Sequence, residues 1–306
     1  MSHRQLRADL ALLLVAAIWG TTFVMVKDAV ASYPVFTFLA IRFGLAAAAM
    51  LPLLRWPQLT RRLISPSLPG NSDTRPSTPL VAGALLGLLL FASYGFQTSG
   101  LQYTTPAKAA FITGLSVVFV PLLAALFWRR MVRPAALLGV LLATGGLALP
   151  SLNTDLAVSR GDLLVLGCAV CVALHILTTG IFAPRADPLR LTAVQLLTVA
   201  VLSGLFALLW ERPLTLPSGS VWFATAFTGL LASSFAFGAQ TVAQRFTSAT
   251  HTALIFVMEP VFAALFSYGL GRETLTARAW LGGGLILAGM VTAELGRPLG
   301  QRLRRR

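Results

Sequence analysis

The sequence Pro121-Leu122-Leu123-Ala124-Ala125-Leu126-Phe127 occurs a second time, lightly altered, as Pro260-Val261-Phe262-Ala263-Ala264-Leu265-Phe266. Five of the seven positions are identical, and the copies lie 139 residues apart in a chain of 306. Upstream, Tyr94-Gly95-Phe96-Gln97-Thr98 is matched by Phe237-Gly238-Ala239-Gln240-Thr241 at a spacing of 143. The four-residue difference is about one helical turn, which a helix absorbs without changing face. The chain therefore contains one unit twice, and we divide it into residues 1–153 and 154–306.

Composition indicates that the lipid bilayer is the main partner of this chain. Hydrophobic residues make up 56% of the sequence, charged residues only 11%, and the mean hydropathy is +0.78. A soluble domain carries roughly 25% charged residues. The net charge of +14 lies in short segments between apolar runs rather than on a folded basic face with interleaved aromatics, so we expect no nucleic-acid partner.

Ten apolar runs have the length of a membrane span. The first half holds 9–27, 33–54, 80–101, 105–128 and 133–151; the second holds 161–182, 189–210, 220–243, 250–270 and 276–295. The segment at about 55–79 is rich in Pro, Ser and Arg and is predicted to be a cytoplasmic linker. Since each half has five spans, the second half is expected to cross the membrane inverted relative to the first.

The distribution of Lys and Arg sets the expected orientation. With both termini in the cytoplasm, 17 of these residues lie on the cytoplasmic side and six on the other, while Arg42 lies within a span. Cytoplasmic loops carry the excess of positive charge. We therefore predict a multi-pass protein of a bacterial inner membrane with both termini cytoplasmic. Inverted repeats of hydrophobic helices are typical of secondary transporters.

Several motifs resemble one known family. Ala17-Ile18-Trp19-Gly20-Thr21-Thr22-Phe23 resembles the Trp-Gly signature of the EamA-type branch of the drug/metabolite transporter superfamily, and Phe38-Leu39-Ala40-Ile41-Arg42-Phe43 is similar to its second-helix pattern. The two Pro-x-x-Ala-Ala-Leu-Phe copies and Gly271-Arg272-Glu273 continue the likeness over nearly the whole chain. One departure is Arg129-Arg130, which breaks the symmetry with that last motif.

The resemblance implies an all-α membrane protein with ten transmembrane helices in two inverted five-helix repeats around a central cavity. The implied activity is movement of a small metabolite, often outward, as with amino acids and related amphipathic compounds. Two inverted halves also favour alternating access over an uncoupled channel or receptor, because equivalent halves can expose one site to each side in turn. Substrate identity, direction of transport and oligomeric state stay open.

Charged side chains within spans are the first candidates for the site, because they are costly at membrane depth. Glu259 precedes Pro260 in the ninth span and is the proton-coupling candidate, which makes protons the candidate coupling ion; a protonated carboxyl bonded to a neighbouring helix is the alternative. Pro260 lacks an N–H and is expected to free the carbonyl of Phe256 and loosen that helix. Arg42 is predicted to form a structural ion pair or to bind carbonyls.

Polar and aromatic residues of the spans complete the predicted substrate site. Gln97 and Gln240 occupy equivalent places in the two halves and either bind substrate or join helices. Trp19 stacks on a ligand ring or fills space, and His175 lines the cavity or packs between helices. The small residues that punctuate the spans are interpreted as helix–helix contacts: Gly83, Gly87, Gly139, Gly145, Gly146, Gly282, Gly283, Gly284 and Gly289.

Lys108 and His251 fall on equivalent positions at the start of the fourth span of each half. A cation is unfavourable at a helix N-terminus unless an anion is close. This makes both residues candidates to bind a substrate carboxylate, with snorkelling to the interface as the alternative.

No cofactor or metal is predicted. Cys168 and Cys171 lie three residues apart in one apolar run and amount to half a metal site at most. A membrane-embedded enzyme and an uncoupled channel or receptor on the same scaffold are the alternative functions. An enzyme calls for clustered catalytic groups, which the scattered His3, His175 and His251 do not form in sequence.

Overall fold

The computed structural model describes residues 3–55, 78–128, 134–151, 159–212, 216–269 and 277–303, and these form helices joined by short turns, with no strand among them. The helices of the first half are α1 (His3–Val30), α2 (Val35–Arg55), α4 (Thr78–Leu101), α5 (Pro106–Gly114), α6 (Ser116–Trp128) and α7 (Pro134–Ser151). Those of the second half are α8 (Arg160–Phe182), α9 (Pro188–Trp210), α10 (Gly219–Gly229), α11 (Ala236–Ala243), α12 (Ala249–Phe256), α13 (Met258–Gly269) and α14 (Ala277–Leu303). A π-helix, Leu230–Phe235, joins α10 to α11.

Eight helical segments in the described part are long and apolar enough to cross a membrane, by length and composition. Three of them are made of consecutive pieces: α5 with α6, α10 with α11 across the π-helix, and α12 with α13. Two shorter apolar helices, Pro134–Gly146 and Trp280–Thr292, fall where the fifth and tenth spans were expected. The predicted linker at about 55–79 lies almost wholly outside the described residues, as do Arg129-Arg130 and Gly271-Arg272-Glu273.

The runs 105–128, 220–243 and 250–270, expected as single spans, are interrupted in the structure. In the last of these, α12 ends at Phe256 and α13 begins at Met258. Pro260 explains the break, because it has no N–H to donate to the carbonyl of Phe256. The matching break in the first half falls at Leu115, between α5 and α6 and six residues before Pro121.

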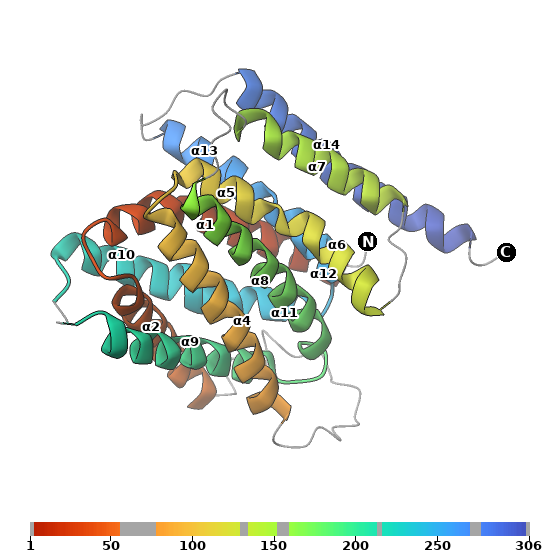
Figure 1. Ribbon diagram of the computed structural model, residues 1–306. Helices are drawn as coiled ribbons and strands as arrows, with labels where there is room; N and C mark the ends of the chain where they lie inside the picture. Colours follow the sequence, from red (N-terminus) through yellow and green to blue (C-terminus); the bar gives the residue numbers. More distant parts are fainter. Residues whose placement is uncertain are drawn as a thin grey trace.

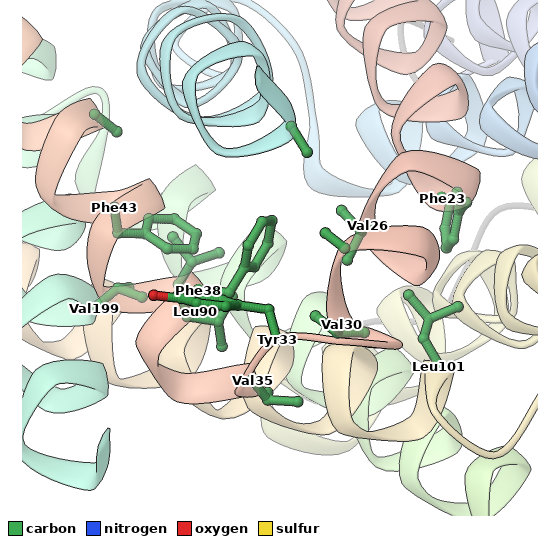
Figure 2. Packing of buried hydrophobic residues seen from close by; sticks show 14 of the residues in the cluster. Phe23, Val26, Val30, Tyr33, Val35, Phe38, Phe43, Leu90, Leu101 and Val199 are labelled. Atoms are coloured by element: carbon green, nitrogen blue, oxygen red, sulfur yellow. The ribbon is translucent and has the colours of Figure 1, made fainter. Parts of the chain in front are cut away.

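Helices of one half pack mainly against helices of the other. The principal contacts join α2 to α9, α4 to α8 and α9, α1 to α13, and α7 to α14. Figure 1 shows α7 and α14 side by side along one edge of the molecule. Figure 2 shows one buried cluster, in which Phe38 and Phe43 of α2 lie with Leu90 of α4 and Val199 of α9.

Glycines allow the closest of these approaches, as the spacing in the sequence suggested. A Cβ on Gly87 of α4 would lie 2.7 Å from the carbonyl oxygen of Gln195 of α9. A Cβ on Gly146 of α7 would lie 2.5 Å from the carbonyl oxygen of Gly282 of α14. Both distances are too short for any side chain, so these glycines set the spacing of the helix pairs. Gly145 and Gly284 were also expected at helix contacts, but nothing lies within 4 Å of such a Cβ, so the expectation is wrong for these two.

A carboxylate joins the two halves at the start of α2. Glu211 follows the end of α9 and accepts hydrogen bonds from the backbone N–H of Phe36 at 2.8 Å and of Thr37 at 2.7 Å. The Thr37 hydroxyl donates to the same carboxylate at 2.9 Å. The first N–H groups of a helix have no partner within the helix. Glu211 therefore stabilises α2 and holds its first turn against α9.

Candidate functional site

A cavity lies between the two halves, with about 760 Å³ of empty space, part of it open to solvent. Its walls come from both halves and combine aromatic and aliphatic side chains with hydroxyls, amides, an arginine, a histidine and a glutamate. The lining includes Trp19, Arg42, Tyr94, Gln97, His175, Phe237, Gln240 and Glu259. A concave site with a few placed polar groups in an apolar wall is typical of small-molecule binding.

Trp19 of α1 is held in place at one side of this cavity. Its indole Nε1 donates to the carbonyl oxygen of Ala232 at 2.8 Å. Its ring lies 5.3 Å from that of Phe237 and 4.9 Å, edge to face, from that of Phe256. With its polar atom bonded to the chain, the ring presents an apolar aromatic surface to the cavity.

Arg42 of α2 is buried and is held without a carboxylate. Its Nε donates to the Ser233 hydroxyl at 3.0 Å, and one terminal nitrogen donates to the Tyr94 hydroxyl at 3.3 Å. The guanidinium carbon lies 4.6 Å from the centre of the Tyr94 ring. No acidic group in the described part of the chain lies within 4.0 Å of this guanidinium. In place of the predicted ion pair, hydroxyls and a ring face hold Arg42.

The π-helix between α10 and α11 supplies both of these acceptors. Ala232 and Ser233 lie within Leu230–Phe235, where each turn holds one residue more than an α-helix. Just before it, a Cβ on Gly229 would lie 2.8 Å from the carbonyl oxygen of Arg42, so the last residue of α10 approaches the backbone of α2 closely. This segment thus positions the side chains of both Trp19 and Arg42 at the cavity. No sequence signal identified it.

Glu259 of α13 lies on the cavity wall and is partly exposed within it. Its carboxyl makes no hydrogen bond or ion pair with another described residue. Gly20 of α1 approaches the same turn, since a Cβ there would lie 2.7 Å from the Glu259 carbonyl oxygen. The Trp19-Gly20 pair therefore brings the aromatic ring and the carboxyl-bearing helix together.

The two glutamines and His175 also border this cavity. Gln97 donates to the Thr113 hydroxyl at 3.2 Å, and Gln240 donates to the Gln244 side-chain oxygen at 3.0 Å. The Gln240 side-chain oxygen is buried without a hydrogen-bond partner in the described residues. His175 Nε2 lies 2.9 Å from the Gln195 side-chain oxygen.

The structure therefore gathers five predicted site residues, Trp19, Gln97, His175, Gln240 and Glu259, around one cavity, together with Arg42. Tyr94 was missed, although the repeat contained its signal. Tyr94 and Phe237 are equivalent positions of the repeated segment that also carries Gln97 and Gln240, and all four line the cavity. Substrate binding by these residues stays a prediction.

Lys108 and His251 lie outside the cavity lining. Lys108 Nζ is 3.8 Å from Oδ2 of Asp162, and His251 Nε2 is 3.1 Å from Oδ1 of Asp9. Each of these basic side chains does have an acid beside it, as expected at a helix N-terminus, but that acid is a carboxyl group of the chain itself. We therefore no longer place these two residues in the substrate site.

The cysteines and possible metal ligands form no further centre in the described residues. Cys168 is buried and lies 3.4 Å, sulfur to oxygen, from the Ser93 hydroxyl. Within the same part of the chain, no three His, Cys, Asp or Glu side chains come together as a metal site would require.

Comparison with known proteins places this geometry in a family context. The model of the EamA-like transporter family matches residues 6–152 and again residues 159–293. An uncharacterized transporter of Archaeoglobus fulgidus is 31% identical over 293 residues, covering 95% of this chain and 87% of that protein. The uncharacterized inner membrane transporter YedA of Escherichia coli is 27% identical over 94% of this chain and 91% of its own length.

A solved crystal structure supports the fold. It superposes with a TM-score of 0.76 and covers 94% of this chain and 98% of the other, at 22% sequence identity.

Proposed function

Because this chain belongs to the EamA-like transporter family, we propose that it is a secondary transporter that moves a small zwitterionic metabolite, such as an amino acid, out of the cell by alternating access. The proposal includes ten membrane spans in two inverted five-helix repeats, with α7 and α14 as the fifth and tenth. Both termini are cytoplasmic in a bacterial inner membrane, as the distribution of Lys and Arg predicts.

One observation carries this proposal: the cavity holds a guanidinium and a carboxyl, and neither is paired with an opposite charge of the described chain. Arg42 has hydrogen-bond capacity left after its contacts with Ser233 and Tyr94, and guanidinium groups match carboxylates in shape and charge. Glu259 suits an ammonium group. A zwitterion supplies both partners at once and leaves no net charge in the membrane interior.

The remaining walls fit the body of an amphipathic molecule. The Trp19 and Phe237 rings offer apolar faces, while Gln97 and Gln240 offer amide donors and acceptors in equivalent places of the two halves. A site shared by two equivalent halves is also what alternating access uses, because either half can then close over the same substrate. The names of the relatives favour a transporter over an enzyme.

The test is counterflow in proteoliposomes loaded with an unlabelled amino acid, measuring uptake of the labelled compound. We expect saturable exchange that zwitterionic amino acids inhibit. N-acetylated or amidated analogues, which lack one charge, should inhibit about tenfold or more weakly, because a charge-assisted hydrogen bond contributes roughly 1.5–3 kcal/mol. Inhibition by the analogues as strong as by the parent compounds contradicts the two-charge site. Unsaturable flux indicates a channel.

A further inference from the structure

Two acid–cation contacts outside the cavity occupy equivalent places in the two halves of the chain. One joins Asp9 of α1 to His251 of α12, and the other joins Asp162 of α8 to Lys108 of α5. In each, an acid on the first helix of one half meets a basic side chain, Lys108 or His251, on the fourth span of the other half. Both contacts therefore bridge the halves.

The sequence supports this equivalence independently. Ala8-Asp9-Leu10 is matched by Gly161-Asp162-Leu163, and the two family matches, 6–152 and 159–293, each begin three residues before the aspartate. Lys108 and His251 follow matching N-caps, since Thr105 accepts from the backbone N–H of Lys108 and Ser248 accepts from that of His251.

The two contacts lie at opposite ends of α1. Lys27, near the end of α1, donates to the carbonyl oxygen of Thr104 at 2.7 Å, and the Thr104 hydroxyl donates to Asp162 at 2.5 Å. Asp9 lies 18 residues before Lys27 on the same helix, which is about 27 Å at 1.5 Å per residue. That length is close to the roughly 30 Å of a bilayer core, and cavity-lining Trp19 lies between the two ends.

The contacts differ in how completely they are bonded. Asp162 also accepts from the backbone N–H of Ser159 at 2.9 Å and is packed under Gly161, where a Cβ would lie 2.6 Å from the carbonyl oxygen of Gly100. At the other contact, the hydroxyl of Thr247, which is equivalent to Thr104, is buried with no hydrogen-bond partner in the described residues. The Asp9 and His251 side chains border a separate hollow with about 650 Å³ of empty space.

From this arrangement we infer that Asp9–His251 and Lys108–Asp162 are two latches that close opposite ends of the transport path in alternation. Asp9 Oδ1 and His251 Nε2 lie 3.1 Å apart without the geometry of a hydrogen bond, so an imidazolium makes this contact as an ion pair. Since each latch joins the two halves, opening one end of the cavity between them requires that latch to break. The inference rests on the proposed transport function, because it assigns the latches to the two access states.

The test measures access to the cavity from each side. A reporter, Val172→Cys, is placed on the cavity wall in a chain with Cys168→Ala and Cys171→Ala. Its reaction with a membrane-impermeant thiol reagent is followed in right-side-out and inside-out vesicles. Asp162→Asn should speed labelling about fivefold or more from the periplasmic side only, and Asp9→Asn from the cytoplasmic side only, which is the range of a modest conformational coupling.

Matched variants separate a latch from a structural role. Asp187→Asn changes an acid at the start of α9 that caps the backbone and makes no contact within 4.0 Å with a described cation. This variant should therefore leave the labelling rate unchanged from both sides of the membrane. Lys108→Met opens one latch while leaving the Ser159–Asp162 capping box intact. If Asp162→Asn fails to fold, Lys108→Met tests the same latch in its place. If Asp9→Asn fails to fold, His251→Leu tests the other latch.

The latch proposal is refuted if the labelling rate changes equally from both sides, or changes no more than with Asp187→Asn. Labelling does not require transport. A wild-type protein without counterflow therefore refutes the proposed function, whereas side-independent labelling refutes the latches alone.

Discussion

Gly20→Ala tests whether the close approach of α1 to α13 supports transport. A Cβ at this position would lie 2.7 Å from the carbonyl oxygen of Glu259, 2.9 Å from the backbone nitrogen of Ala263 and 2.9 Å from Cβ of Phe262. Ordinary contacts begin at 3.4 Å, so α13 must move away by about the difference between 3.4 and 2.7 Å. Backbone atoms and a Cβ cannot rotate out of the way, so the whole turn that carries Glu259 has to shift.

The expected cost follows from this displacement. Inserting a methyl group into a packed interior typically costs about 1–3 kcal/mol. We expect a melting temperature several degrees lower in detergent, and a counterflow rate lower by about tenfold, because the Glu259 carboxyl moves relative to the Trp19 ring. Gly44→Ala is the matched control, because nothing lies within 4 Å of a Cβ there, and it should match or exceed the wild type in stability. A Gly20→Ala protein with wild-type melting and exchange refutes the reasoning.

Three further outcomes are expected. Glu259→Gln keeps the shape but cannot ionise, so it should abolish uptake driven by a pH gradient. Exchange at equal pH should remain saturable but need about tenfold more substrate, because the substrate ammonium loses its charged partner. Accumulation of substrate by this variant under a pH gradient alone shows that another group couples transport to protons. A Cβ on Gly289 would lie 2.6 Å from the carbonyl oxygen of Gly139, so Gly289→Val should separate α14 from α7 and lower the melting temperature by several degrees. Gly284→Val is the control and should not lower it, because nothing lies within 4 Å of a Cβ there. A reporter active only in the periplasm and fused after residue 306 should stay silent, and activity there contradicts the cytoplasmic C-terminus.

The membrane class and the positions of the apolar helices could be predicted from the sequence, because burial in lipid depends on composition along each run. The shared location of Gln97 and Gln240 was also within reach, since equivalent positions of a repeat take equivalent places around a common site. Their partners were not predictable in the same way. Whether Gln97 bonds to Thr113, and Gln240 to Gln244, depends on the rotation of each helix about its own axis.

What the sequence by itself determined is an apolar chain with two related halves and a small set of polar residues at membrane depth. Only the tertiary structure decided what those residues contact. Arg42 donates a hydrogen bond to Ser233, 191 positions away, because a π-helix places that hydroxyl beside it. No local sequence pattern predicts the π-helix. Lys108 and His251 face Asp162 and Asp9 rather than the cavity, because each lies at the meeting of the two halves. Apolar burial adds up residue by residue along the chain, whereas the pairing of polar groups depends on which helices meet, and at what rotation.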